Sequence, residues 1–209
     1  IKTLVASMPI SQRPEHHDLS IKHKNWLTSK YQNAYGVEID LTGAYLSFEN
    51  ILTDKKFTSD LGLANSKARL RMMTLYQIAA STTGLVIGTG NKVEDFGVGF
   101  YTKYGDGGVD ISPIADCNKS QVWAMGKELS ILEEIQMAEP TDGLWSDGRT
   151  DTDQLGMSYK EIEHLMSRPD EVGYDKYLAI RKKNLHKMKP IPVCKFDGKD
   201  TLDTDQKET

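Results

Sequence analysis

Residues 84–91 read GLVIGTGN and determine the fold that we expect for this chain. The apolar run from Leu85 to Ile87 lies between glycines, which is typical of a strand covered on both faces of a parallel sheet. Sheets of this type bind ligands at the carboxyl ends of their strands, where the loops gather. We therefore expect functional residues in the loop after Ile87 and around Ser112.

Strand-like and helix-like patterns alternate on both sides of this run. Upstream, apolar spacing predicts strands at 3–6 and 37–41 and helices at 15–31 and 44–52. Asn65 is predicted to cap a helix that buries Met72, Leu75, Ile78 and Ala79. Asn118 is predicted to cap another, with Val122, Met125 and Leu129 facing inward. The order predicts an α/β protein, a parallel sheet with helices on both faces.

Length and composition restrict the class of protein. A chain of 209 residues suits one large domain, and a net charge of -4 speaks against a general nucleic-acid binder. No apolar run is long enough for a membrane span and no signal peptide is visible, so we expect a cytoplasmic protein without a membrane partner. Cys117 and Cys194 fit neither a metal site nor a disulfide framework. We expect a domain over 1–196 and a flexible acidic tail over 197–209.

The segment from Gly88 to Gln121, GTGNKVEDFGVGFYTKYGDGGVDISPIADCNKSQ, combines glycines with cations and carboxylates. Glycines let backbone N–H groups approach anionic oxygens, lysines attract phosphates, and carboxylates can hold Mg2+ beside a substrate phosphate. Together they suit a nucleotide-phosphate site. A glycine-rich surface loop with solvated charges is the alternative, and spacing alone does not decide between the two.

Six motifs resemble those of NAD synthetases, in that family's order and spacing. They are NSKARLRM from Asn65, IGTGNKVE to Glu94, TKYGDGG from Thr102, SPIADCNK to Lys119, EPTDGLW from Glu139 and HKMKPIP from His186. The resemblance implies an adenine-nucleotide α-hydrolase-like fold and a homodimer that binds deamido-NAD across its interface. It also implies a ligase, in which ATP adenylates the nicotinate carboxylate and ammonia, supplied directly or from glutamine, then expels AMP.

The resemblance assigns roles residue by residue. It makes Lys119 and Asp106 the catalytic residues, with Asp106 near the ammonia site, and it makes Glu94 the Mg2+ ligand. The implied ATP contacts are Thr89, Lys119 and Thr141. The implied deamido-NAD contacts are Arg69, Lys103, Asp110, His186 and Lys187.

Each of these residues also has a purely structural interpretation. Arg69 and Lys103 could be surface cations, and Asp110 could cap a turn. Glu94 could be an ordinary charge near a helix start, and His186 a surface or packing histidine.

The sequence departs from the family in one large respect. The family's phosphate-binding loop, SGGxDS, does not occur in residues 1–209. Because the unit around that loop supplies a strand and a helix, we expect it on a longer protein or on a separate chain. The native mass should then exceed 23.4 kDa, or a second polypeptide should co-purify.

Two other functions remain open at this point. One is a non-catalytic module that binds the dinucleotide without the ATP loop. The other is a different ATP-pyrophosphatase, such as a relative of GMP or asparagine synthetase, although Arg69, the TKYGDGG block and the His186–Lys187 pair favour a dinucleotide substrate.

Overall fold

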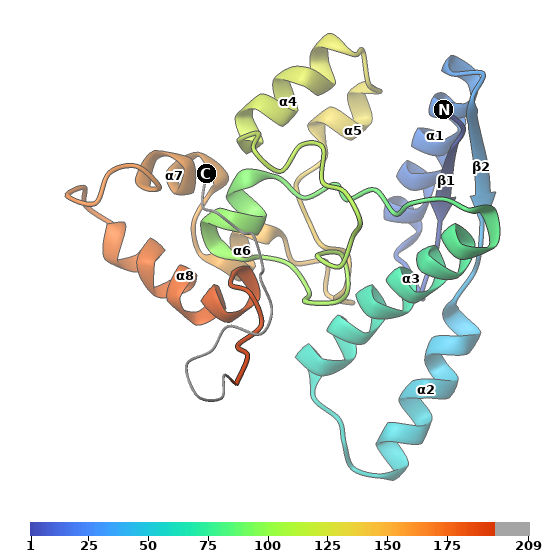
Figure 1. Cartoon of the computed structure of the whole chain (residues 1–209), viewed down its shortest axis with the longest axis horizontal. Coiled ribbons are helices and arrows are strands. Elements are labelled where there is room, and N and C mark those ends of the chain that lie inside the picture. The colour runs from blue at the N-terminus through green and yellow to red at the C-terminus, as the bar shows by residue number, and fades with distance from the viewer. Residues whose placement is uncertain (195–209) are drawn as a thin grey trace.

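The computed structural model describes residues 1–194, so the predicted tail at 197–209 lies outside the described residues. The elements follow in chain order: β1 (Thr3–Ser7), α1 (Pro14–Lys30), β2 (Ala34–Glu38), α2 (Thr42–Asp54), α3 (Asp60–Thr82), the π-helix η1 (Lys92–Val98), α4 (Lys119–Glu128), α5 (Glu133–Met137), α6 (Asp151–Leu155), α7 (Tyr159–Leu165) and α8 (Tyr174–Met188). In Figure 1, β1 and β2 lie at one side with α1 to α3, and α6 to α8 lie at the opposite side.

The sheet confirms the predicted parallel pairing. β1 and β2 run parallel, with Thr3 opposite Ala34 and Ser7 opposite Glu38, and α1 is the helical crossover that packs against both strands. The apolar run at 85–87 contributes only a parallel bridge between Ile87 and Ile111 in the described part of the chain. This single bridge sets the loop after Ile87 beside the segment around Ser112. Leu85 and Ile87 are 67% and 52% exposed, so the prediction of a strand covered on both faces is wrong.

α3 begins earlier than predicted. Its N-cap is Ser59, whose hydroxyl accepts a hydrogen bond from the backbone N–H of Gly62 at 3.0 Å, so the prediction that Asn65 caps this helix is wrong. Asn65 lies inside the helix and accepts from the Thr102 hydroxyl at 2.6 Å. Of the predicted buried stripe, Met72 and Ala79 are buried.

The largest core cluster joins η1 to the three C-terminal helices. Its buried members are Val93, Val98, Leu155, Met157, Tyr159, Ile162, Leu165 and Tyr177. Apolar burial of this kind is the main source of stability in a domain. The cluster therefore fixes η1, which carries Glu94, against α7 and α8.

α4 starts where predicted but does not bury the predicted face. Asn118 is its N-cap, and the Asn118 backbone N–H donates to the Gln121 side chain at 2.8 Å. No residue of α4 is fully buried, and Leu129 just beyond it is 50% exposed, so the predicted inward orientation of Met125 and Leu129 is wrong. No helix within residues 1–194 has the length and apolar character needed to cross a membrane.

Candidate functional site

A cleft of about 870 Å³ lies between α3, the loops after Ile87, the 139–149 loop and α8. Six residues predicted from the sequence line it: Arg69, Thr89, Lys103, Asp106, His186 and Lys187. Four others do not line it: Glu94, Asp110, Lys119 and Thr141. Residues from four separate segments thus converge on one cavity, which is the usual form of a small-molecule site.

Basic side chains connect α3, the loop at 101–103 and α8 along the cleft. Arg69 of α3 donates from Nε to the carbonyl of Lys103 at 3.2 Å, and Lys103 Nζ donates to the carbonyl of His186 at 3.3 Å. Lys187 Nζ donates to the carbonyl of Tyr101 at 2.7 Å. None of these three cations is within salt-bridge distance of a carboxylate in the described residues, although Asp106 and Asp142 also line the cleft.

Asp110 has a structural role in this state. Its Oδ1 accepts from the Tyr76 hydroxyl at 3.1 Å, and its Oδ2 accepts from the backbone N–H of Val86 at 2.7 Å. These bonds tie the loop to the start of the apolar run at 85–87. Both contacts join segments far apart in the chain, so Asp110 has a structural role other than the predicted turn cap. It stands beside the cleft rather than in its lining.

Asp106 lines the cleft, and its Oδ1 accepts from the backbone N–H of Thr102 at 2.9 Å. Asp95, which the sequence reasoning missed, belongs to the same group of charges. Burial raises the pKa of Asp95 to about 6, repulsion from Glu94 and Asp106 adds to the rise, and Lys187 opposes it. A Cβ atom on Gly90 would overlap the Asp95 carboxylate, so a side chain at position 90 would displace this acid.

Lys119 and Glu94 form a shielded ion pair outside the lining of the cleft. Lys119 Nζ lies 2.5 Å from Glu94 Oε1, and the two side chains are only 16% and 17% exposed. Asn91 places Glu94 in the first turn of η1, because its Oδ1 accepts from the backbone N–H groups of Val93 and Glu94. Lys119 Nζ also lies 4.6 Å from the ring centroid of Tyr159.

The Tyr159 ring connects this pair to a second buried acid. Its hydroxyl donates to Asp151 Oδ2 at 2.6 Å, and the two residues are 4% and 5% exposed. Burial raises the pKa of Tyr159, so its hydroxyl stays protonated as a donor. The sequence reasoning named neither residue; an acid and an aromatic side chain eight positions apart gave no recognisable spacing.

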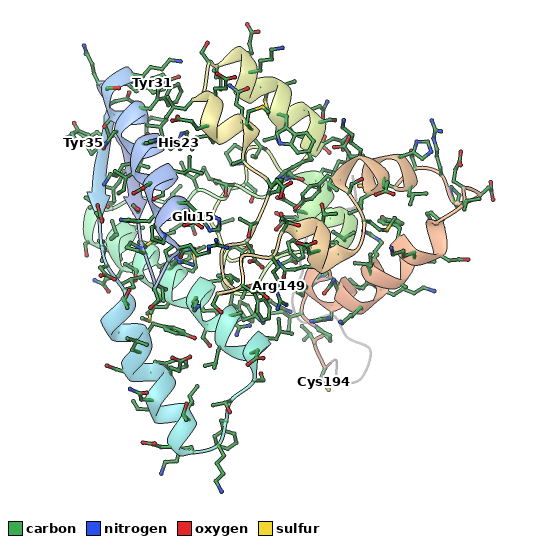
Figure 2. The ribbon with its side chains drawn as sticks, turned by 180° about the vertical axis from the view of Figure 1, so that it is seen from behind. Glu15, His23, Tyr31, Tyr35, Arg149 and Cys194 are labelled. Atoms are coloured by element: carbon green, nitrogen blue, oxygen red, sulfur yellow. The ribbon has the colours of Figure 1, made fainter. Side chains whose placement is uncertain are left out.

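Thr141 closes the 139–149 loop on itself. Its hydroxyl donates to the carbonyl of Arg149 at 3.0 Å and accepts from the backbone N–H of Gly143 at 3.1 Å. In the rear view of Figure 2, Arg149 lies toward the middle of the molecule, away from His23 and Tyr31 on the α1 side. Three residues of this loop, Asp142, Leu144 and Trp145, line the cleft.

Two further cations that the sequence reasoning missed hold this loop. Arg71 donates from Nε to the carbonyl of Met8 at 2.9 Å and from Nη2 to Gln12 Oε1 at 2.8 Å. Gln12 in turn donates to the carbonyl of Gly143 at 2.7 Å. Lys67, one helical turn before Arg71, donates to the carbonyl of Leu144 at 3.0 Å. Burial lowers the pKa of both Lys67 and Arg71.

Residues 2–195 match the family model described as NAD synthase. The chain belongs to the NAD synthase family. An NH3-dependent NAD(+) synthetase from Carboxydothermus hydrogenoformans is 38% identical over 167 residues, which make up 79% of this chain and 66% of that relative. The chain therefore spans slightly less than two thirds of the length of this relative.

Solved structures agree with membership of the NAD synthase family. An NMN synthetase from Francisella tularensis superposes with a TM-score of 0.82 at 30% identity, covering 94% of this chain and 80% of that one. An NH3-dependent NAD synthetase from Campylobacter jejuni, at 23% identity and a TM-score of 0.65, shares the fold over 92% of this chain and 77% of its own. The predicted α/β fold is confirmed, and the family match favours NAD synthases over the other ATP-pyrophosphatases considered.

Proposed function

We propose that this chain is part of a carbon–nitrogen ligase that uses ATP to amidate deamido-NAD to NAD. The observation that carries the proposal is a cleft lined by three cations, Arg69, Lys103 and Lys187, that form no salt bridge within residues 1–194. A fourth cation, Lys119, is shielded and paired with Glu94 outside this lining. The relatives' names, NH3-dependent NAD(+) synthetases, support this activity. They favour it over the non-catalytic binding module.

The charges suit a reaction in two steps. A carboxylate resists ammonia, so the nicotinate carboxylate first attacks the α-phosphate of ATP and pyrophosphate leaves. Lys119 would leave Glu94 for the phosphate and stabilise the charge that develops there. Ammonia then attacks the acyl carbon and AMP departs. Arg69, Lys103, His186 and Lys187 would hold the dinucleotide, whose phosphates match their positive charge.

Mg2+ is part of the proposal, with Glu94 as its protein ligand. Within residues 1–194 no group of three or more metal-ligating side chains occurs. Mg2+ is commonly held by one or two carboxylates together with substrate phosphates and water, so a single carboxylate beside the ATP lysine fits this ion. Magnesium would screen the phosphate charges while Lys119 neutralises the α-phosphate.

Ammonia is the nitrogen donor that we propose, because the relatives are named for NH3 rather than glutamine. Asp106 would act beside it. This residue lines the cleft, and its charge influences the neighbouring Asp95. The carboxylates of Asp106 and Asp95 would together attract ammonium and supply an acceptor for its proton.

A homodimer is the proposed assembly, and the reaction is placed in the cytoplasm. Large apolar side chains stand exposed along α2, α3 and the connection between them: Leu46, Phe48, Ile51, Phe57, Leu61 and Met73. Apolar surface gathered on adjacent elements in this way is typical of a protein interface. Leu61 also lines the cleft, so a second copy on this face would complete the substrate site.

A second product has specific support. The solved structure that covers 94% of this chain at 30% identity is an NMN synthetase. The corresponding activity here would amidate nicotinate mononucleotide to NMN through the same adenylate chemistry. The two candidates differ only in whether the cationic end of the cleft receives a dinucleotide or a mononucleotide.

One assay tests both candidates. The protein as isolated from its source, with any chain that supplies the phosphate-binding loop, is given ATP, Mg2+ and ammonium with either deamido-NAD or nicotinate mononucleotide. We expect NAD with matched amounts of AMP and pyrophosphate, and a higher kcat/KM for deamido-NAD. A higher kcat/KM for the mononucleotide would assign the second product. Neither product from a folded protein would contradict the ligase.

A further inference from the structure

We propose that Asp151, Tyr159 and Glu163 are positioning residues that hold Lys119 for its encounter with the phosphate of ATP. The inference rests on the ATP-binding role proposed above for Lys119. It concerns α6 and α7, to which the sequence comparison assigned no function. Two independent sets of contacts carry it, one to the Lys119 side chain and one to its backbone.

The side-chain contacts run through Tyr159. Its ring centroid lies 4.6 Å from Lys119 Nζ. Cation–π attraction at this distance stabilises the ammonium group over the ring, and the attraction is stronger for a cation shielded from water. The same ring packs edge-on against Trp123 of α4 at 6.4 Å. The Tyr159 hydroxyl is then fixed by Asp151 Oδ2 at 2.6 Å. Asp151 therefore sets the orientation of the ring against which Lys119 rests.

The backbone contacts come from Glu163, one helical turn beyond Tyr159 on the same face of α7. Glu163 Oε1 accepts from the backbone N–H of Ser120 and Oε2 accepts from the Ser120 hydroxyl, both at 2.7 Å. Ser120 directly follows Lys119 in the first turn of α4. The carboxylate therefore anchors the turn from which the Lys119 side chain extends.

Stability alone does not explain this arrangement. Asp151 Oδ1 is buried without a hydrogen-bond partner in the described part of the chain, and such an oxygen costs free energy. Burial raises the pKa of Asp151, with the Tyr159 hydrogen bond opposing the rise. Phenylalanine in place of Tyr159, packed on an apolar residue in place of Asp151, would fill the same volume at a lower cost in desolvation free energy. The costly pair makes sense if it keeps the Tyr159 ring in one orientation.

The arrangement has a consequence for the reaction. Lys119 would leave Glu94 when ATP binds, because the phosphate would replace the carboxylate as its partner. During this exchange the Tyr159 ring and the Glu163 anchor still restrict the lysine. Displacing a catalytic group by about 1 Å can cost about 100-fold in rate, so these contacts should affect turnover more than ground-state binding.

The test compares matched substitutions in the isolated protein. Tyr159→Phe removes the hydroxyl and keeps the ring, and Tyr177→Phe is its control because Tyr177 is equally buried in the same core cluster. Asp151→Asn tests the acid. Glu163→Gln is matched by Glu161→Gln, since Glu161 accepts from the backbone N–H and hydroxyl of Ser158 at the start of α7 instead.

We expect kcat to fall by about 10- to 100-fold in Tyr159→Phe, Asp151→Asn and Glu163→Gln, with a smaller change in KM for ATP. The dissociation constant of deamido-NAD should not change, and both controls should keep wild-type kcat. Equal losses in the controls and the three test variants would show a merely structural role and overturn the proposal. So would wild-type kcat in all three test variants.

A second measurement separates this inference from the proposed function. The rate at which an amine-acylating reagent labels Lys119 at one fixed pH is followed by mass spectrometry, with exposed Lys92 as the internal reference. Labelling of Lys119 relative to Lys92 should rise in the three test variants and not in the controls. Unchanged labelling overturns the inference even if the enzyme is active. A wild-type protein that makes neither NAD nor NMN refutes the function, while the labelling still tests the positioning.

Discussion

Two groups of cations, named here the Lys119 end and the Arg69 end of the site, differ in their partners. Lys119 lies outside the lining of the cleft, and Arg69, Lys103 and Lys187 lie in it. At the Lys119 end, the ammonium group is paired with a carboxylate at 2.5 Å and rests on an aromatic ring, and both charged side chains are largely shielded. At the Arg69 end, the hydrogen bonds that Arg69, Lys103 and Lys187 donate within residues 1–194 go to backbone carbonyls. Lys103 and Lys187 also lie over the rings of Tyr104 and Tyr101. Lys119 is therefore charge-balanced by a direct partner before any ligand arrives. Arg69, Lys103 and Lys187 have no carboxylate within salt-bridge distance in the described residues, and Asp106 lines the cleft beside them.

This difference indicates how the work of the site is divided. A shielded pair is costly to desolvate and to separate, which suits a group whose position at the reacting phosphate must be reproducible. Hydrogen bonds to carbonyls are readily exchanged for stronger bonds to phosphate, which suits a group that captures a large anion. We therefore expect substitutions at the first end to affect turnover and those at the second to affect binding.

The largest effect is expected from Lys119→Ala. Loss of a preorganised cation at a developing charge costs about 100- to 1,000-fold in kcat, while deamido-NAD binding should stay close to wild type. Unfolding should also become easier, because Glu94 would remain shielded without its partner. Adenylation is measured as pyrophosphate release and binding by calorimetry. Lys92→Ala, which removes a pair with a mostly exposed Asp116, is the control. Normal turnover in Lys119→Ala would remove the contrast between the two ends.

Arg69→Ala should show the opposite pattern. We expect deamido-NAD binding to weaken by about 1–3 kcal/mol, as for the loss of a charge-assisted hydrogen bond, with little change in kcat at saturating substrate. Thermal unfolding should be nearly unaffected because Arg69 is exposed. Titration of the variant with deamido-NAD measures the change. An unchanged dissociation constant would place Arg69 outside the binding site.

The sequence allowed much of the fold to be predicted because its signals were local. The first strand, the helix over 15–31 and the cap at Asn118 depend on neighbouring residues, and each prediction was confirmed. The second strand pairs in parallel as predicted but lies at Ala34–Glu38, so its prediction at 37–41 was wrong by three residues. The start of α3 was placed wrongly at Asn65 because any polar residue before an apolar stripe resembles a cap. The buried face of α4 was misjudged because burial depends on which elements pack against it, and periodicity does not give that information.

The candidate site was predicted in part for the same reason. Residues in recognisable motifs, such as Lys103 and His186, do line one cleft. Asp151 and Arg71 were missed because their partners lie in segments that come together only after folding; Arg71 binds residues 59 and 63 positions earlier in the chain. The role of Asp110 was also not decided by sequence, since its contacts with Tyr76 and Val86 are tertiary.

Arg71→Met should produce an intermediate effect, which acts on protein stability and on the 139–149 loop. Methionine keeps the volume but leaves the carbonyl of Met8 and the Gln12 side chain without their donors. Unfolding should become easier by about 1–3 kcal/mol. Amide hydrogen exchange should rise in the 139–149 loop, which Gln12 contacts at Gly143. Faster exchange throughout the protein, without a preference for this loop, would contradict the proposed tie.

Thr141→Val should give the smallest effect. It shows whether the Thr141 hydroxyl mainly stabilises the 139–149 loop or mainly binds ATP. The hydroxyl already donates to Arg149 and accepts from Gly143, so its loss should lower the unfolding free energy by about 0.5–1.5 kcal/mol. We expect only a small rise in KM for ATP, because the loop must open these bonds before Thr141 can reach the nucleotide. Thr141→Ser, which keeps the hydroxyl, should restore both values. A large rise in KM for ATP without loss of stability would contradict this expectation. It would mean that Thr141 exchanges its loop hydrogen bonds for ATP as readily as Arg69 exchanges its bond to the Lys103 carbonyl for a phosphate. Only Lys119 and its neighbours would then be preorganised.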